Sequence, residues 1–461
     1  MSFSQKVDVI IYGASGFSGK YILRELLKFC DLGEGKSRRV GIAGRSRSKL
    51  SAALIWAMSG LESFTPAAVT IFEADVQDSA SLDYMCSQTR LIINCVGPFR
   101  LHGDQVVAAC VRAGIDYIDL AGEPGFMSGI IDKYHEQARR KRSLIITSCG
   151  FESIVHELGL LFTSRQLRAN NPDAELTAVD MYVLPDGRRG FWEPNFGTYA
   201  SAVLVMANEG GLKQLLRSAW KPRHRSPPPQ IKGTNRRGFV HWHEVSQTWA
   251  LKMVAPGDAP SPVGIMMDRT VRAANEESGR MLETEEDDSD PTRGEEKRKK
   301  LEGIKPMQQH TEYLCFRSLW GLLAMFWFSF VVLILSSFRK GVDLLLQYPE
   351  LFSLGFVRKD GPEQSAIDAS TFQIWYEGRG FSSSSRKGKK KSDVQVLTSV
   401  CGPDLGYVST PICAVQAALI ILDLRTSLPL GGVLSPGAAF GCTDLENRLE
   451  ASGIKFHVIN T

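Results

Sequence analysis

The chain has 461 residues and a formal net charge of +4 at pH 7. This length allows two or three domains with a large buried core, and 43% hydrophobic and 23% charged residues are typical of a globular protein. The net charge is small and no basic helix carries interleaved aromatic residues, which argues against nucleic-acid binding. The nine cysteines form no Cys-x-x-Cys pair, so we expect a reducing compartment and no metal site.

The N-terminal segment does not match a signal peptide. A strand-like apolar run begins at Val7, which leaves no room for a basic start, an apolar region and a cleavage site. We therefore expect the folded domains to lie on the cytosolic side.

Residues 7–19, "VDVIIYGASGFSG", predict a dinucleotide-binding turn. A β-branched strand precedes three glycines at the spacing G-x-x-G-x-x-G, and a helical pattern follows them. Gly13 would permit the tight turn, Gly16 would let backbone N–H groups approach a pyrophosphate, and Gly19 would let the helix pack close to the strand. The alternative is a turn with a purely structural role.

Strands and helices then alternate to about residue 155. The strand-like runs are continuous and rich in Val and Ile, as strands buried on both faces should be, and they cover residues 38–46, 68–76, 90–99, 115–123 and 143–151. This rhythm predicts an α/β fold with a Rossmann-type, doubly wound parallel sheet over residues 1–155. Its ligand should lie at the carboxyl ends of the strands.

The end of the second predicted strand indicates the cofactor. NAD sites usually place Asp or Glu there to accept bonds from the ribose hydroxyls, whereas this chain has Gly44, Arg45, Ser46 and Arg47. A guanidinium can hold a 2′-phosphate through charge-assisted, bidentate hydrogen bonds. We therefore predict NADP(H), with NAD(H) as the alternative. In the other interpretation, the two arginines only cover a solvated helix start.

The fourth strand ends in "NCVGPF", which brings Asn94, Gly97 and Pro98 to the same edge of the sheet. A polar group followed by a turn suits contact with the ribose or the nicotinamide side of a cofactor. The alternative is a turn that simply ends the strand.

Three carboxylates are candidates for proton transfer. Asp119 and Glu123 follow the fifth strand, and Glu152 holds the same position one strand later. Each could instead cap a helix, because backbone N–H groups at a helix N-terminus stabilise a carboxylate. We find no Tyr-x-x-x-Lys pair and no nucleophile elbow, so the catalytic residues stay unassigned.

The strand–helix alternation stops after residue 155. Strand-like runs at 175–185 and 238–245, with a helical run at 197–216 between them, predict a second α+β domain over residues 156–400 with an antiparallel sheet. Residues 276–300 have too few apolar groups to offset their ordering entropy, which predicts a mobile loop. A C-terminal segment, residues 401–461, contains an apolar helix at 409–424 and a strand-like ending.

Residues 318–338 are uncharged and bounded by basic residues. As a helix this stretch would be about 31 Å long, near the thickness of a bilayer core. Three interpretations stay open: a membrane span, a helix buried in the protein core, and an anchor in one leaflet. Since apolar residues continue to 356, we favour a one-sided anchor over residues 318–356.

Together these motifs resemble the saccharopine dehydrogenase-like oxidoreductase family. The matching segments are "GASGFSG", "AGRSRSKL", "NCVGPF", "YIDLAGE", "GFESI", "GPDLGYVSTPI" and "GGVLSPGAAF", which cover nearly the whole chain. The resemblance is closest to the animal-type proteins, which are associated with lipid droplets and membranes. Bacterial relatives include trans-acting enoyl reductases of complex-lipid synthesis. The resemblance also implies that the C-terminal segment packs back onto the earlier domains.

The resemblance assigns the cofactor residues. The phosphates would be held by Gly13, Ser15, Gly16, Phe17, Ser18 and Gly19, the adenosine phosphate would meet Arg45, and the nicotinamide half would approach Asn94, Val96 and Gly97. The chain departs from the family's "GFDSIP" with "GFESIV", which places Glu152 where the family has Asp and loses a proline.

We therefore expect an NADP(H)-dependent oxidoreductase that acts on a small, lipid-like carbonyl or enoyl substrate at the cytosolic face of a membrane or lipid-droplet monolayer. The alternatives are a non-catalytic, dinucleotide-binding scaffold on lipid droplets and a soluble amino-acid dehydrogenase. An amino-acid dicarboxylate would need convergent basic side chains, whereas the basic clusters here fall in apparent loops. The sequence leaves open whether the protein forms a homo-oligomer.

Overall fold

The computed structural model describes residues 6–29, 38–59, 69–208, 238–253, 309–382 and 392–459. The predicted loop at 276–300 lies outside these residues. The chain forms two compact units. Unit 1 contains Met1–Val155 and Gly406–Ser452, and unit 2 contains His156–Leu405 and Gly453–Thr461.

Unit 1 is built on the predicted parallel sheet. It has seven strands in the order β13-β6-β5-β4-β1-β2-β3, and all its paired strands are parallel. The core strands are buried along their length, which explains their continuous apolar sequences. The strands are β1 (Val9–Tyr12), β2 (Val40–Gly44), β3 (Val69–Glu73), β4 (Leu91–Asn94), β5 (Asp116–Asp119), β6 (Leu144–Ile146) and β13 (Gly432–Leu434).

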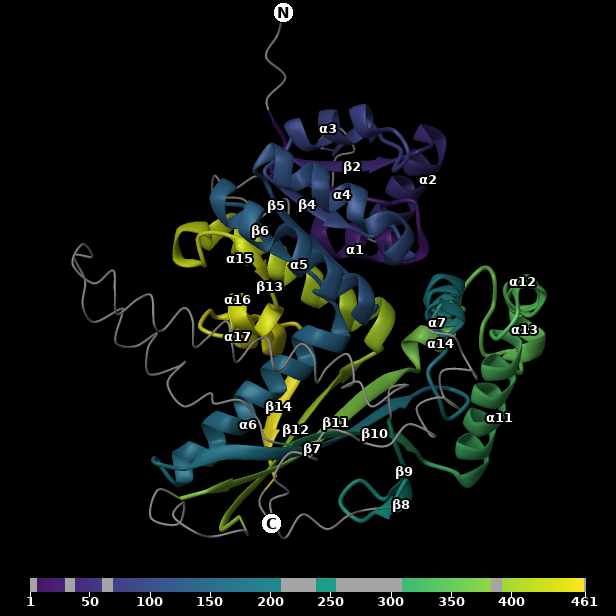
Figure 1. Ribbon diagram of the computed structural model, residues 1–461, viewed down its shortest axis with the longest axis vertical. Coiled ribbons are helices and arrows are strands. Elements are labelled where there is room, and N and C mark those ends of the chain that lie inside the picture. Colours follow the sequence, from purple (N-terminus) through teal and green to yellow (C-terminus); the bar gives the residue numbers. More distant parts are fainter. Residues whose placement is uncertain are drawn as a thin grey trace, which may run out of the picture. The chain divides into compact units, whose positions relative to one another are not determined.

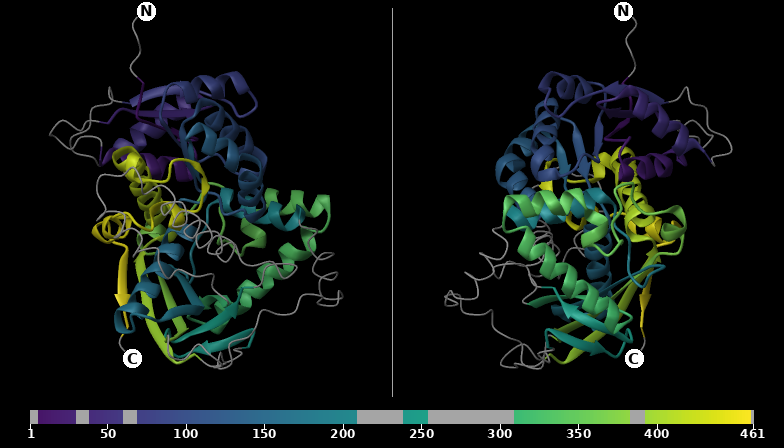
Figure 2. Two further views of the ribbon diagram at one scale, coloured as in Figure 1. Left: turned by 60° about the vertical axis from the view of Figure 1, so that its left-hand side comes forward. Right: turned by 90° about the vertical axis from the view of Figure 1, so that its right-hand side faces the viewer.

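Helices lie on both faces of this sheet (Figures 1 and 2). On one face α3 (Ser79–Ser87), α4 (Phe99–Ala113) and α5 (Pro124–Lys141) pack side by side. On the other, α1 (Phe17–Leu27) packs against α2 (Arg47–Met58) and α15 (Thr410–Leu424). The doubly wound Rossmann-type architecture is therefore confirmed.

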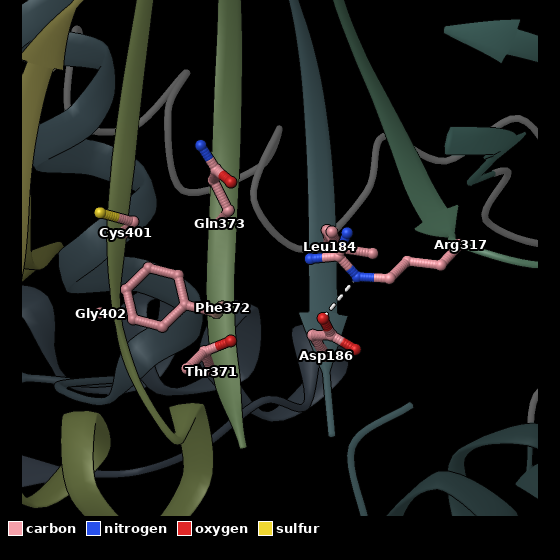
Figure 3. A pocket seen from close by; sticks show the side chains of 8 residues that line it. All are labelled: Leu184, Asp186, Arg317, Thr371, Phe372, Gln373, Cys401 and Gly402. Atoms are coloured by element: carbon pink, nitrogen blue, oxygen red, sulfur yellow. Dashed lines mark hydrogen bonds and ion pairs between the residues drawn. The ribbon is translucent and has the colours of Figure 1, made fainter. Parts of the chain in front are cut away.

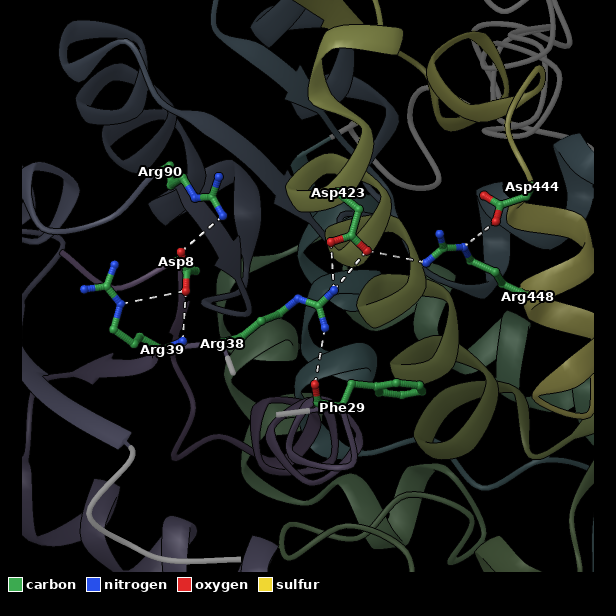
Figure 4. Close-up of polar contacts among 8 residues, drawn as sticks. All are labelled: Asp8, Phe29, Arg38, Arg39, Arg90, Asp423, Asp444 and Arg448. Carbon is green, nitrogen blue, oxygen red and sulfur yellow. Dashed lines mark hydrogen bonds and ion pairs between the residues drawn. The ribbon is translucent and has the colours of Figure 1, made fainter. Parts of the chain in front are cut away.

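The C-terminal part of unit 1 closes both an edge and a face of the sheet. Strand β13 pairs with β6 as the seventh strand, and α16 (Pro436–Phe440) and α17 (Leu445–Ala451) follow it. Ion pairs hold α15 and its C-cap in place. Arg38 Nη2 lies 2.8 Å from Asp423 Oδ1 (Figure 4), and Arg425 Nε lies 2.7 Å from Asp116 Oδ2. This segment completes the dinucleotide fold from a distant part of the chain.

Unit 2 contains a mixed sheet, which corrects the expectation of an antiparallel one. Its order is β14-β12-β11-β7-β10-β9-β8. Strands β7 and β10 are parallel. Parallel neighbours need a long connection, and the segment between these two strands contains α7 (Phe196–Asn208) and the β8–β9 hairpin. The strands are β7 (Glu175–Asp186), β8 (Val240–His243), β9 (Thr248–Lys252), β10 (Gln309–Phe316), β11 (Thr371–Phe381), β12 (Val394–Pro403) and β14 (Lys455–Val458).

Helix α6 (His156–Asn170) covers one face of this sheet, where Thr163 Oγ1 lies 2.6 Å from Thr398 Oγ1 on β12. On the other face the sheet coils strongly. Although β8 is four positions from β11, His243 Nε2 lies 2.9 Å from Glu377 Oε1 and its ring stacks on Tyr182 at 3.6 Å. His241 and His243 thus belong to a strand that folds back over the core, within the strand-like run predicted at 238–245.

The apolar stretch forms a helix within unit 2. Helix α11 (Leu319–Leu335) begins at Ser318, whose Oγ accepts the Gly321 N–H at 3.1 Å, and it is followed by α12 (Arg339–Gln347) and α13 (Pro349–Phe352). A short helix, α14 (Gln364–Asp368), precedes β11. Among the described residues, the helix long and apolar enough to cross a membrane is Leu405–Ser427, and 78% of an apolar stretch of 18 residues within it is buried in the protein.

Candidate dinucleotide site and apolar surface

The glycine loop between β1 and α1 has the geometry of an anion site. Gly13 has a φ of 85°, and a Cβ there would lie 2.8 Å from Val96 Cγ2. A Cβ on Gly19 would overlap the Gly13 carbonyl oxygen, so the close approach of helix and loop requires glycine. Gly16 is the N-cap of α1 and has no side chain to accept a hydrogen bond from the first-turn N–H groups. Those groups could bind a phosphate.

Arg45 lies at the end of β2, where a cation could bind the 2′-phosphate of NADP. It is exposed and directly follows β2, the strand that pairs with β1. In the described part of the chain it forms no ion pair, so its charge is available for a phosphate. Burial and the nearby Asp75 raise the pKa of Tyr12, the last residue of β1, to about 12, whereas the positive charge of Arg45 acts to lower it.

Asn94 at the end of β4 is wholly buried and already hydrogen-bonded. Its Nδ2 donates to Tyr117 Oη at 3.0 Å, and its Oδ1 accepts the Val96 N–H at 3.0 Å. The side chain therefore shapes the turn. Val96 and Gly97 are more accessible, so they would provide any direct contact with a dinucleotide at this strand end.

Two of the three candidate carboxylates have structural partners. Asp119 is wholly buried and accepts bonds from Tyr117 Oη at 2.8 Å, Ala121 N–H at 3.0 Å and Ser148 N–H at 2.7 Å. Burial raises the pKa of Asp119 to about 6, although these bonds oppose the shift. Glu123 accepts the Phe99 and Arg100 N–H groups at 2.9 and 3.0 Å, and so caps the N-terminus of α4.

Glu152 is the accessible carboxylate of the three. It lies in a short π-helix, η2 (Phe151–Val155), that leads into α6. Desolvation by the surrounding protein raises its pKa, although the side chain remains open to solvent. Its Oε2 lies close to Gly122, where an added Cβ would be 2.6 Å away. A raised pKa makes the protonated form of Glu152 more populated than that of an ordinary exposed glutamate.

Sequence reasoning missed two tyrosines that shape this edge. Tyr117 links Asn94 to Asp119. Tyr407 packs edge-on against Phe17 with ring centroids 4.9 Å apart, and thereby fixes the first turn of α1. The motif "GPDLGYVSTPI" contained the signal for Tyr407, but the pattern alone does not show that it contacts the glycine loop.

Helices α11–α13 form an exposed apolar surface on unit 2, and Figure 1 shows α11 beside strands β9 and β10. The inner face of α11 packs on Tyr199, Val203 and Phe316. The outer face exposes tryptophan and phenylalanine, with Trp320 81% exposed. The apolar surface consists of Leu319, Trp320, Leu323, Phe326, Trp327, Phe330, Ile334, Phe338, Leu344, Tyr348, Leu351 and Leu354.

A cavity of about 310 Å³ lies at the base of α11 in unit 2. Figure 3 shows Arg317, the residue before the helix cap, reaching Asp186, and Arg317 Nε lies 2.5 Å from Asp186 Oδ2. The other lining residues are Leu184, Thr371, Phe372, Gln373, Cys401 and Gly402. Because Arg317 is paired with Asp186, this cavity has a mixed polar and apolar lining and is not a strong anion site. The described residues contain no group of three or more His, Cys, Asp or Glu side chains that could hold a metal.

These features define a class. A parallel Rossmann-type sheet, a glycine loop at a helix N-terminus and a basic residue after β2 are the marks of an NADP-binding oxidoreductase domain. The family model of the saccharopine dehydrogenase NADP-binding domain matches residues 9–146.

The chain belongs to the saccharopine dehydrogenase-like oxidoreductase family. It is 38% identical over 98% of its length to a probable mitochondrial saccharopine dehydrogenase-like oxidoreductase of Arabidopsis thaliana, of which 96% is covered. It is 28% identical to a lipid droplet localized protein of Caenorhabditis elegans, with 98% of each chain covered. A putative trans-acting enoyl reductase of Mycobacterium tuberculosis is 31% identical over 53% of this chain and 57% of its own.

Among solved structures, the apo saccharopine dehydrogenase (L-Glu forming) of Saccharomyces cerevisiae has the same fold. Its TM-score is 0.50 at 13% identity, with 98% of this chain and 100% of that chain covered. The predicted family, fold class and NADP cofactor are confirmed.

Proposed function

We propose that this protein is an NADP(H)-dependent oxidoreductase that acts on a lipid-like carbonyl or enoyl group at the cytosolic surface of a membrane or lipid droplet. One observation carries the proposal: a chain with an NADP-binding domain also exposes the apolar surface of α11–α13. The printed names of the nematode and mycobacterial relatives support the lipid surface and the enoyl group respectively.

In this proposal the chain's own residues hold the dinucleotide in three places. The first-turn N–H groups of α1, with Ser15, Phe17 and Ser18 beside the three glycines, bind the pyrophosphate. Arg45 binds the 2′-phosphate. Val96 and Gly97 lie along the nicotinamide half, on a turn that Asn94 fixes. When bound, NADPH supplies a hydride.

We assign the proton to Glu152 over Asp119 and Glu123. The latter two carboxylates already accept the hydrogen bonds that hold the sheet edge and cap α4. Glu152 is accessible, and desolvation raises its pKa. A carboxylic acid whose pKa lies closer to neutrality is suited to donating a proton to a substrate.

The apolar surface would bind lipid in the plane of the interface. Helix α11 has 17 residues, which gives about 25 Å at ~1.5 Å per residue, less than the ~30 Å of a bilayer core. Its inner face is already packed on unit 2. Burying a half-exposed large apolar side chain contributes roughly 1 kcal/mol, so the outer face is sufficient for stable interfacial binding. Arg317, Arg339 and Lys340 would lie near the headgroups.

A scaffold that binds NADP without catalysis is the second candidate function. It is favoured because Asp119 and Glu123 already accept hydrogen bonds within the protein.

The test is to incubate the protein with NADPH deuterated at C4 and a lipid extract. We expect a lipid that gains one deuterium, together with flotation of the protein on lipid. NADPH binding without any transfer of deuterium would support the scaffold, and failure to float would contradict the lipid surface.

A further inference from the structure

The amino edge of the parallel sheet in unit 1 contains a cavity that the dinucleotide site does not use. Its volume is about 630 Å³, which is in the range of small-molecule sites. Its lining residues stand just before the strands: Asp8 before β1, Arg39 before β2, Arg90 before β4 and Arg142 before β6. The glycine loop and Arg45 follow the opposite, carboxyl ends of these strands, so the two sites lie at opposite edges of one sheet.

The cavity has an excess of positive charge. Apart from the Arg425–Asp116 pair, four cations and one carboxylate line it: Lys6, Arg39, Arg90 and Arg142 against Asp8. Asp8 is shared by two of these cations: Arg90 Nη2 lies 3.1 Å from its Oδ1, and Arg39 Nε lies 4.0 Å from its Oδ2, which also accepts the Arg39 backbone N–H at 2.9 Å (Figure 4). Three positive charges therefore remain in excess.

These cations are not explained by the helix ends at this edge. Gly114 and Arg142 are the C-caps of α4 and α5, and exposed carbonyls at such helix ends attract cations. Arg425 performs that role at α5, because it donates to the carbonyl of the C-cap Arg142; its bonds to the Pro429 and Leu430 carbonyls are to the loop before β13. Within the described ranges, the Arg142 guanidinium itself forms no hydrogen bond or ion pair.

The cations are spread along the edge. In the sheet order β6-β5-β4-β1-β2, Arg142 and Arg39 stand four strand positions apart, which is about 19 Å at ~4.8 Å per strand. Lys6 and Arg90 lie between them, before β1 and β4. This row is longer than one phosphate and suits a molecule with several anionic groups.

We propose that this cavity binds a small organic polyphosphate, with its phosphate groups on Arg39, Arg90 and Arg142. Guanidinium groups match phosphate oxygens in a bidentate way, which a row of lysines would not do. The site is separate from the proposed reaction and from the lipid surface, and the inference depends on neither.

The test is isothermal titration of the full chain saturated with NADPH, so that adenine nucleotides cannot enter the dinucleotide site. The probes are ATP, inositol 1,4,5-trisphosphate and inorganic tripolyphosphate, with citrate as a carboxylate of similar charge at matched ionic strength. We expect one organic phosphate to bind with a stoichiometry of one, more tightly than tripolyphosphate and citrate. ATP binding would indicate a soluble nucleotide, and inositol trisphosphate binding would indicate a lipid headgroup.

Arg142→Asn removes one cation while keeping a side chain that tolerates the positive φ of 54° at this position. We expect affinity to fall on the order of tenfold, and Arg90→Gln should do the same. The matched control is Arg140→Asn, an exposed residue of the same helix that does not line the cavity. The proposal is overturned by no binding of any phosphate, by equal binding of citrate, or by an equal loss in Arg140→Asn in variants with unchanged melting temperature.

Discussion

The role of the apolar surface in lipid binding can be tested most directly, because its residues lie outside the core and can be replaced without unfolding the protein. We consider the double substitution Trp320→Ser and Trp327→Ser on α11. The two indoles are 81% and 54% exposed, so their removal should leave the packing of unit 2 and the melting temperature nearly unchanged. If they insert into lipid, the same substitution should weaken lipid binding strongly.

The magnitude follows from the exposed fractions. Full burial of a large apolar side chain contributes roughly 1.5–3 kcal/mol. Scaled by exposure, Trp320 should contribute about 2 kcal/mol and Trp327 about 1 kcal/mol on insertion. Their sum, about 3 kcal/mol, corresponds to a roughly hundredfold lower partition coefficient.

The assay is flotation with phospholipid vesicles and with a triglyceride emulsion carrying a phospholipid monolayer. The matched control replaces Ile55 and Tyr84, two exposed side chains of unit 1 that are 71% and 58% accessible, with serine. We expect control protein to float like the wild type. Unchanged flotation of the tryptophan variant, or an equal loss in the control, would refute lipid insertion through α11.

The remaining predictions concern the cofactor edge. Arg45→Ala should weaken NADPH binding roughly ten- to hundredfold, because it removes charge-assisted hydrogen bonds, and it should leave NADH binding unchanged in a fluorescence titration; equal effects on both would contradict the 2′-phosphate role. Gly19→Ala should lower the melting temperature and abolish NADPH binding, because its Cβ would overlap the Gly13 carbonyl oxygen; normal binding would mean that the loop can relax. Asp119 has a pKa raised from 3.8 to about 6, so its stabilising, protonated form is complete below about pH 4 and lost as the pH rises through 6. Relative to Asp119→Asn, the wild type should lose about 3 kcal/mol of unfolding free energy across that range, measured by urea denaturation at each pH; parallel pH profiles would contradict the buried proton. Glu152→Gln should retain NADPH affinity but reduce deuterium transfer from labelled NADPH at least tenfold, and full activity would exclude Glu152 as the proton donor.

The local features of the cofactor fold could be predicted from sequence because each depends on neighbouring residues. The glycine turn needs a positive φ at Gly13 and a close contact at Gly19, and both requirements show in the spacing. The buried parallel strands show in runs of Val and Ile. Strand β13 was not predicted, because three residues that begin at the second of two glycines give no periodic signal and the partner strand β6 is far away in sequence.

The polar side chains at the carboxyl end of the parallel sheet show a second limit of prediction from sequence. From sequence, Asn94 and Asp119 both reach the carboxyl end of their strands, where ligands bind. The structure adds Tyr117, whose hydroxyl donates a hydrogen bond to Asp119 and accepts one from Asn94. Both candidate side chains are therefore hydrogen-bonded within the protein. Strand position predicts the edge correctly, but only three-dimensional contacts show which side chains remain available to a ligand.

The topology of unit 2 bears on the three interpretations of the apolar stretch and supports the proposed one-sided anchor. Helices α11–α13 connect β10 to β11, and these two strands flank the same strand, β7. A span through a membrane would place β10 and β11 on opposite sides, which is incompatible with their shared pairing to β7. A buried helix is excluded by the exposed outer face of α11, since only Leu322 and Val332 of that helix are buried. The insertion therefore leaves and re-enters the sheet on one side, and its outer face is free to lie on a lipid surface while β7 keeps both neighbours.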